Sequence, residues 1–171
     1  TQLRRRVMLL DDAPRRNTSP LAALSGQIED YRADRPGIED EVADWFDALD
    51  ITKVYGNLGG GVSKGQWYKM LMVSLFVIRP ELWLRDEPFS AGLDASGLQT
   101  LEAQIRAHRD SGGIVIFSSQ WPDHARRLAD RALVLHEGRS VWEAEPAQRV
   151  PAESLATADG ALRAVLQGLS A

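Results

Sequence analysis

Short apolar runs alternate with longer helical patterns along this chain, and this alternation limits the fold more than any other feature of the sequence. The runs occupy residues 7–10, 82–84 and 114–117 and are almost entirely apolar. A strand that is apolar on both faces is typical of a parallel sheet covered by helices on both sides. The sequence therefore predicts an α/β fold with a mostly parallel sheet, whose ligands gather beyond the carboxyl ends of the strands.

Helix start signals lie between these runs. Ser19 followed by Pro20 is typical of a helix N-terminus, because the hydroxyl caps free N–H groups and proline is tolerated in the first turn. Residues 64–78 form a long helical pattern, and Asp94 is placed to cap the helix that follows it. Toward the C-terminus the pattern predicts a short helix at 122–129, a hairpin of strands at 132–135 and 140–142, and a helical tail at 144–171.

The composition excludes several function classes. The formal net charge of −4 gives no overall attraction to nucleic acid or anionic lipid. With no cysteine, disulfides, thiolate metal sites and cysteine nucleophiles are ruled out. The longest apolar stretch, residues 70–78, is too short to span a bilayer. The sequence is that of a cytosolic protein.

Two adjacent carboxylates follow one of the predicted strands. Asp86 at this place is suited to hold Mg²⁺, which prefers one or two carboxylates together with phosphate oxygens. Glu87 is suited to orient and deprotonate an attacking water in phosphoryl transfer. A strand that ends in a solvated turn would give the same short pattern, so the pair needs support from its neighbours.

Residues 62–66 (VSKGQ) lie at the start of the long helical pattern. The backbone N–H groups and the positive dipole end of a helix favour an anion there. A serine hydroxyl adds a donor, and a glycine lets a phosphate approach closely. A serine-capped helix without a ligand would show the same residues.

Taken together, several segments resemble the motifs of ABC ATPases, in the order that the family shows. The LSGGQ signature, the Walker B segment and the D-loop are matched by residues 62–66, 80–88 (PELWLRDEP) and 90–94 (SAGLD). Residues 129–131 and 134–138 are similar to the strand and turn that close these domains. The resemblance covers residues 4–143 and implies a P-loop NTPase-like sheet joined to an ABC helical subdomain.

The resemblance implies a role for each motif residue. Asp86 would hold Mg²⁺, and Glu87 would be the catalytic base for ATP hydrolysis. The residues implied to meet the ATP held by an opposite subunit are Ser63, Lys64, Gly65, Gln66 and Asp94. Of these, Ser63 and Gly65 would contact the γ-phosphate, and Asp94 would link the two sites across the dimer interface.

The chain also departs from the family. No G-x-x-x-x-G-K-[ST] phosphate loop occurs, so we expect the N-terminal phosphate-loop part of the domain to be missing from this chain, with an exposed sheet edge and a tendency to aggregate. Asp12 stands where the Q-loop glutamine is expected, and Gln120 stands in place of the switch histidine, where it can hydrogen bond a γ-phosphate but not shuttle a proton. Lys64 replaces a signature glycine, and Arg85 is placed to pair with Asp86. These changes predict a slow or regulatory ATPase.

The resemblance predicts four parts in the chain. They are a strand with the Q-loop-like region at 1–17, a helical subdomain with the signature at 18–79, the C-terminal part of the ATPase core at 80–143, and the tail at 144–171. The implied function is that of an exporter-like ABC transporter ATP-binding subunit, which uses ATP and Mg²⁺. It would form a head-to-tail dimer with a second nucleotide-binding domain and act on a membrane subunit from the cytoplasmic face, without nucleic acid.

Two alternatives stay open. A degenerate, non-catalytic module that lends its signature to an active partner would explain Gln120 and the absent phosphate-loop pattern, although Glu87 argues against it. A non-transport ABC ATPase of the DNA-repair class would carry long coiled coils before the signature, and no sustained heptads occur here. The five tryptophans are expected to pack in the core or in grooves, and Trp67 on the signature helix is the one that we consider as a contact to a partner.

Overall fold

The computed structural model describes residues 6–10, 19–31, 33, 35–53, 62–90 and 92–144. The chain forms two compact units that divide after Ser118. The predicted Q-loop position Asp12, the glycine-rich residues 56–61 and the predicted helical tail lie outside the described residues. No helix within the described ranges combines the length and the apolar character that a bilayer span requires.

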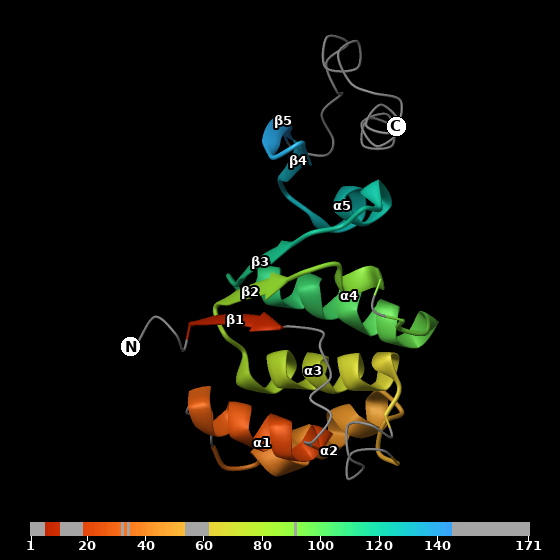
Figure 1. Cartoon of the computed structure of the whole chain (residues 1–171). Coiled ribbons are helices and arrows are strands. Elements are labelled where there is room, and N and C mark those ends of the chain that lie inside the picture. The colour runs from red at the N-terminus through yellow and green to blue at the C-terminus, as the bar shows by residue number, and fades with distance from the viewer. Residues whose placement is uncertain are drawn as a thin grey trace. The chain divides into compact units, whose positions relative to one another are not determined.

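Three parallel strands form the sheet of the first unit. They are β1 (Val7–Leu10), β2 (Leu82–Arg85) and β3 (Ile114–Phe117), in the order β1-β2-β3 (Figure 1). Leu10 is paired with Arg85, and Arg85 with Phe117, so the three carboxyl ends are aligned at one edge. The predicted parallel sheet is confirmed, and Asp86 follows β2 at this edge.

Four helices accompany this sheet: α1 (Pro20–Tyr31), α2 (Ile38–Ala48), α3 (Lys64–Ile78) and α4 (Ala95–Asp110). Three of them, α1, α3 and α4, start at a capping side chain, whereas α2 starts after Gly37 without one. The Ser19 hydroxyl accepts from the N–H of Ala22 at 3.2 Å, and the Asp94 carboxylate accepts from the N–H of Gly97 at 2.8 Å. A short 3-10 turn at Pro88–Ser90 connects β2 toward α4.

Helix α3 is the centre of the first unit. All its residues from Trp67 to Val77 are buried, which requires packing on every side. It lies between the layer of α1 and α2 and the sheet (Figure 1). Trp67 is 2% exposed, so the expectation that it contacts a partner is wrong: the indole is enclosed by its own chain.

The two faces of the sheet differ. Met8 and Trp83 are almost fully buried on one face. On the other, Leu9, Ile114 and Ile116 are 64%, 59% and 57% exposed. The strand at 114–117 is therefore less buried than its apolar sequence predicts, because within the described residues only one face is covered.

The second unit contains α5 (Pro122–Leu128) and the antiparallel strands β4 (Ala132–His136) and β5 (Arg139–Ala144). The two residues of the turn, Glu137 and Gly138, have positive φ angles of 48° and 74°, as a tight hairpin requires. Trp121 is 62% exposed at the start of α5. Trp121 is therefore not packed in the core, which is one of the two places expected for the tryptophans.

Candidate functional site

Asp86 and Glu87 lie at the carboxyl edge of the sheet, and Ser118 from the next strand joins them. The Ser118 hydroxyl donates to Asp86 Oδ1 at 2.6 Å and accepts from the backbone N–H of Glu87 at 2.9 Å. The backbone N–H of Ser118 donates to the carbonyl oxygen of Arg85 at 3.0 Å. One hydroxyl thus orients both the predicted metal carboxylate and the backbone of the predicted base.

Glu87 adopts an unusual backbone conformation. Its φ of 43° lies in the left-handed region, which costs a non-glycine residue roughly 1–3 kcal/mol. Two hydrogen bonds stabilise this conformation. The Glu87 N–H donates to the Ser118 hydroxyl, and in the 3-10 turn the Ser90 N–H donates to the Glu87 carbonyl oxygen at 3.0 Å. The Ser90 hydroxyl also donates to Glu87 Oε2 at 3.3 Å. Such strained residues cluster at functional sites.

The signature segment forms the start of α3 and is closed by a capping box. Ser63 Oγ accepts from the N–H of Gln66 at 3.2 Å, and Gln66 Oε1 accepts from the N–H of Ser63 at 3.0 Å. The cap uses a lone pair of the hydroxyl and leaves its proton to donate to a ligand. Ser63 and Lys64 are exposed, so an anion can approach this helix start from solvent.

The signature and the D-loop touch through two glycines. A Cβ on Gly65 would collide with the carbonyl oxygen of Gly92. Gly92 has a φ of 77°, which also favours glycine there. The backbone of the D-loop therefore rests directly on the predicted phosphate-contacting turn of α3.

Asp94 is tied to the signature helix by a charge pair. Lys69 Nζ donates to Asp94 Oδ2 at 2.8 Å and to the carbonyl oxygen of Leu49 at 2.9 Å. The Lys69 side chain is 7% exposed and that of Asp94 60% exposed. The hydrogen bond from Lys69 and then that from the Gly97 N–H hold the pKa of Asp94 below its ordinary value. This role of Lys69 was not expected from the sequence, because Lys69 stands within a mostly apolar helical pattern without a motif around it.

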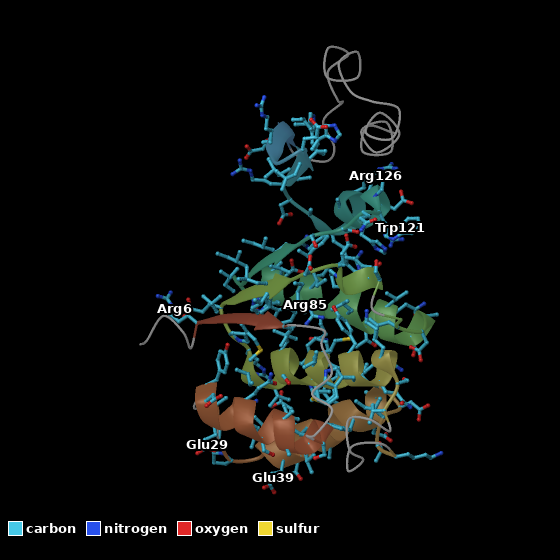
Figure 2. All side chains as sticks on the ribbon, viewed as in Figure 1. Arg6, Glu29, Glu39, Arg85, Trp121 and Arg126 are labelled. Carbon is cyan, nitrogen blue, oxygen red and sulfur yellow. The ribbon has the colours of Figure 1, made fainter. Side chains whose placement is uncertain are left out.

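The sequence position of Arg85 suggested an ion pair with Asp86, and the structure does not form it. Its side chain is buried between the sheet and α3 (Figure 2), with the guanidinium carbon 4.5 Å from the ring centroid of Tyr68. Nε and both terminal nitrogens have no hydrogen-bond partner among the described residues. Burial lowers the pKa of the guanidinium. Successive strand residues point to opposite faces, which sends Arg85 inward with Trp83 and away from the edge.

The predicted site residues thus fall into groups. Asp86 and Glu87 meet at the strand ends, and Ser63 to Gln66 share one turn of helix beside the D-loop. Gln120 lies in the second unit, and its predicted contact with the γ-phosphate stays a prediction. Ser118 was missed from the sequence, although a hydroxyl directly after a strand at the same sheet edge is the signal that points to it.

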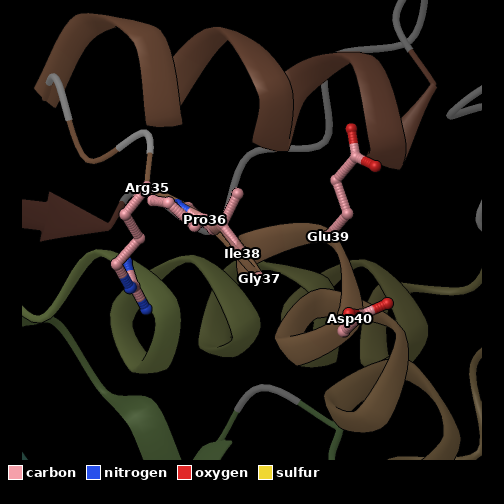
Figure 3. A pocket seen from close by; sticks show the side chains of 6 residues that line it. All are labelled: Arg35, Pro36, Gly37, Ile38, Glu39 and Asp40. Carbon is pink, nitrogen blue, oxygen red and sulfur yellow. The ribbon is translucent and has the colours of Figure 1, made fainter.

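The described residues contain no group of three or more His, Cys, Asp or Glu side chains arranged to hold a metal ion. A single ordered carboxylate, Asp86, fits Mg²⁺, because that ion keeps waters and takes phosphate oxygens instead of a full protein cage. A hollow elsewhere is lined by residues 35–40 at the start of α2 and contains no predicted site residue (Figure 3). There the Arg35 guanidinium donates hydrogen bonds to the carbonyl oxygen of Val77 at 3.0 Å and to the carboxylate of Glu41.

Solved structures share this fold. The ATP-binding subunit of an ABC transporter matches with a TM-score of 0.77 and 20% identity, over 97% of this chain and 69% of that one. The ATP-binding cassette MJ0796, solved as a dimer in a post-hydrolysis state with ADP and Pi, matches with a TM-score of 0.68 and 18% identity, over 84% of this chain and 65% of that one. The fold is that of an ABC ATPase domain, as the sequence predicts.

Sequence relatives give the family more closely. YhaQ of Bacillus subtilis, an ABC transporter ATP-binding protein, is 31% identical over 101 residues, which make up 59% of this chain and 34% of that protein. The chain spans about a third of the length of the curated relatives it matches. No protein-family model matches it. Its relatives are ABC transporter ATP-binding proteins, and the resemblance read from the motifs is confirmed.

Proposed function

We propose that this chain is part of the ATP-hydrolysing subunit of an ABC transporter. The observation that carries the proposal is the arrangement at the strand ends, where Ser118 holds the Asp86 carboxylate and the Glu87 backbone together at one edge of a parallel sheet. Metal and base carboxylates for phosphoryl transfer are needed at this edge. The relatives, which are ABC transporter ATP-binding proteins, support the same reaction.

Each predicted residue receives a role in this proposal. Asp86 would hold Mg²⁺, which would supply neutralisation of the phosphate charge, and Glu87 would take the proton of the attacking water. Gln120 donates a hydrogen bond to the γ-phosphate, and Asp12 occupies the Q-loop position. The parts at 1–17, 18–79, 80–143 and 144–171 keep the subdomain roles that the motifs imply.

The signature acts in trans. We place the exposed start of α3 against the γ-phosphate of ATP held by a second nucleotide-binding domain in a head-to-tail dimer. The available Ser63 proton, the Gly65 backbone and the charge of Lys64 suit that anion. The Gly65–Gly92 contact and the Lys69–Asp94 pair then carry the state of the signature to the D-loop of the same chain.

The wider setting follows the relatives. The subunit is proposed to lie at the cytoplasmic face of a membrane and to drive a membrane subunit by ATP-dependent closure of the dimer. The dimeric state of the MJ0796 cassette with ADP and Pi supports the dimer and the nucleotide.

A second candidate is the degenerate module that lends its signature to an active partner. Gln120 in place of the switch histidine favours it, together with the absence of a phosphate-loop pattern in this sequence. The ordered Asp86–Glu87 pair favours hydrolysis instead, because a module without chemistry has no need of a strained, oriented base.

Phosphate release by the full-length gene product separates the two candidates. Glu87→Gln is expected to keep ATP binding and lower kcat by roughly 10²–10⁴-fold, the usual contribution of a general base. Glu39→Gln is the matched control, since Glu39 is exposed on the helical layer far from the strand ends (Figure 2). Equal turnover in the two variants would refute the role of Glu87.

A further inference from the structure

The Ser118 hydroxyl has a defined proton direction. Its oxygen accepts from the Glu87 N–H at 2.9 Å, so its single proton is given to Asp86 Oδ1 at 2.6 Å. A distance in this range is typical of a charge-assisted O–H···O⁻ hydrogen bond. One of the two carboxylate oxygens of Asp86 therefore already accepts a strong hydrogen bond.

Ser118 is also fixed in place by the sheet. Its N–H donates to the carbonyl oxygen of Arg85 at 3.0 Å, continuing the ladder between β2 and β3. The hydroxyl and the carboxylate are thus carried by neighbouring positions of one rigid ladder. Among the described residues, none donates a hydrogen bond to Asp86 Oδ2, which leaves that oxygen for a metal ion.

We propose that Ser118 is a specificity-determining residue that makes Asp86 a one-oxygen ligand and so favours Mg²⁺ over Ca²⁺. The inference rests on the proposed function, in which Asp86 holds the metal of the bound nucleotide. Mg²⁺ takes single oxygens in a strict octahedron at short distance, whereas Ca²⁺ gains from carboxylates that bind with both oxygens. With Oδ1 held by Ser118, two-oxygen ligation places the metal ion and this proton donor on the same oxygen, which weakens the charge-assisted hydrogen bond.

Removal of the hydroxyl releases Oδ1 for a metal ion. In Ser118→Ala the carboxylate is free to rotate and to present both oxygens, so Ca²⁺ gains while Mg²⁺ does not. We expect the preference for Mg²⁺ over Ca²⁺ to fall about ten-fold, which corresponds to about 1.4 kcal/mol. A role limited to holding the strand ends together would weaken binding of both ions alike and leave their ratio unchanged.

The experiment measures the Kd of ATP for the full-length gene product in saturating Mg²⁺ and in saturating Ca²⁺ by calorimetry. A Glu87→Gln background keeps the ATP intact and leaves the backbone N–H of residue 87 in place. Ser119→Ala is the matched control. The Ser119 hydroxyl accepts from the N–H of Trp121 at 3.1 Å and forms no hydrogen bond with Asp86 or Glu87 among the described residues. Ser118→Thr keeps a hydroxyl and is expected to keep the wild-type ratio.

A ratio of the two Kd values that falls in Ser118→Ala and stays unchanged in Ser119→Ala and Ser118→Thr supports the inference. An unchanged ratio in Ser118→Ala overturns the inference and leaves the proposed function standing. Failure of the parent protein to bind ATP in a metal-dependent way overturns both. If Ser118→Ala does not fold, Ser118→Thr is compared with Ser118→Val instead. Threonine and valine have nearly the same shape and differ only in a hydroxyl against a methyl group, so the same change in the ratio is expected between these two variants.

Discussion

Replacement of Arg85 by methionine is predicted to stabilise the folded chain, although it removes the one charged side chain of β2. The guanidinium is buried with none of its nitrogens hydrogen bonded among the described residues, and burial lowers its pKa. An ion buried in this way costs several kcal/mol. Its stacking on Tyr68 at 4.5 Å returns only about 0.5–2 kcal/mol.

Methionine fills a similar volume and carries no charge, so Arg85→Met is expected to raise the free energy of unfolding by about 1–3 kcal/mol. For a chain of this size, each kcal/mol raises Tm by roughly 2–4 °C. Urea unfolding and calorimetry on the full-length gene product measure both quantities. A gain of about 2 kcal/mol therefore appears as an increase in Tm of roughly 4–8 °C.

Arg106→Met is the matched control for this prediction. Arg106 is 42% exposed on α4 and pairs with Glu102 at 3.6 Å, so its loss changes stability by less than about 1 kcal/mol. Combining Arg85→Met with Tyr68→Leu should give a coupling energy of about 1 kcal/mol, the share of the stacking contact. A loss of 2 kcal/mol or more in Arg85→Met would show that the charge is satisfied, and would refute the reasoning.

Two further predictions concern the contact between the signature and the D-loop. Gly65→Ala is expected to lower the free energy of unfolding by more than about 2 kcal/mol, because its Cβ meets the Gly92 carbonyl oxygen. The control Gly26→Ala has open space around it in α1 and is expected to raise the free energy of unfolding by about 0.5–1 kcal/mol. Urea unfolding measures both, and equal effects would contradict the close approach. Asp94 has a lowered pKa, so its pairing with Lys69 contributes stability above its ordinary pKa of 3.8, and that contribution is lost as the pH falls through the lower folded value. The stability difference between wild type and Asp94→Asn should therefore be constant near neutral pH and shrink as the pH falls below 3.8, and a difference that does not depend on pH would contradict the pairing.

The local elements were predictable because their signals are local. Caps at Ser19, Ser63 and Asp94 fix the starts of three helices, and each uses a side chain within three residues of the N–H it accepts from. The three apolar runs became the three strands for the same reason. The motifs added the order of the site residues along the chain.

The site contacts were less predictable because they depend on register between segments far apart in sequence. Ser118 meets Asp86 only because β2 and β3 are paired with Arg85 opposite Phe117. Lys69 reaches Asp94 only because α3 packs with the loop before α4. Alternation along β2 would have placed Arg85 on the inner face, and the expected pairing with Asp86 failed because that geometry outweighs charge attraction between neighbours.

The most direct test of the central claim is ATP turnover by the full-length gene product, compared with its Glu87→Gln variant and the Glu39→Gln control. We expect phosphate release that depends on Mg²⁺, is retained in Glu39→Gln and falls at least roughly a hundred-fold in Glu87→Gln while ATP remains bound. A protein that binds no ATP, or one whose turnover does not change in Glu87→Gln, would contradict the assignment of the Asp86–Glu87 edge as the hydrolytic site.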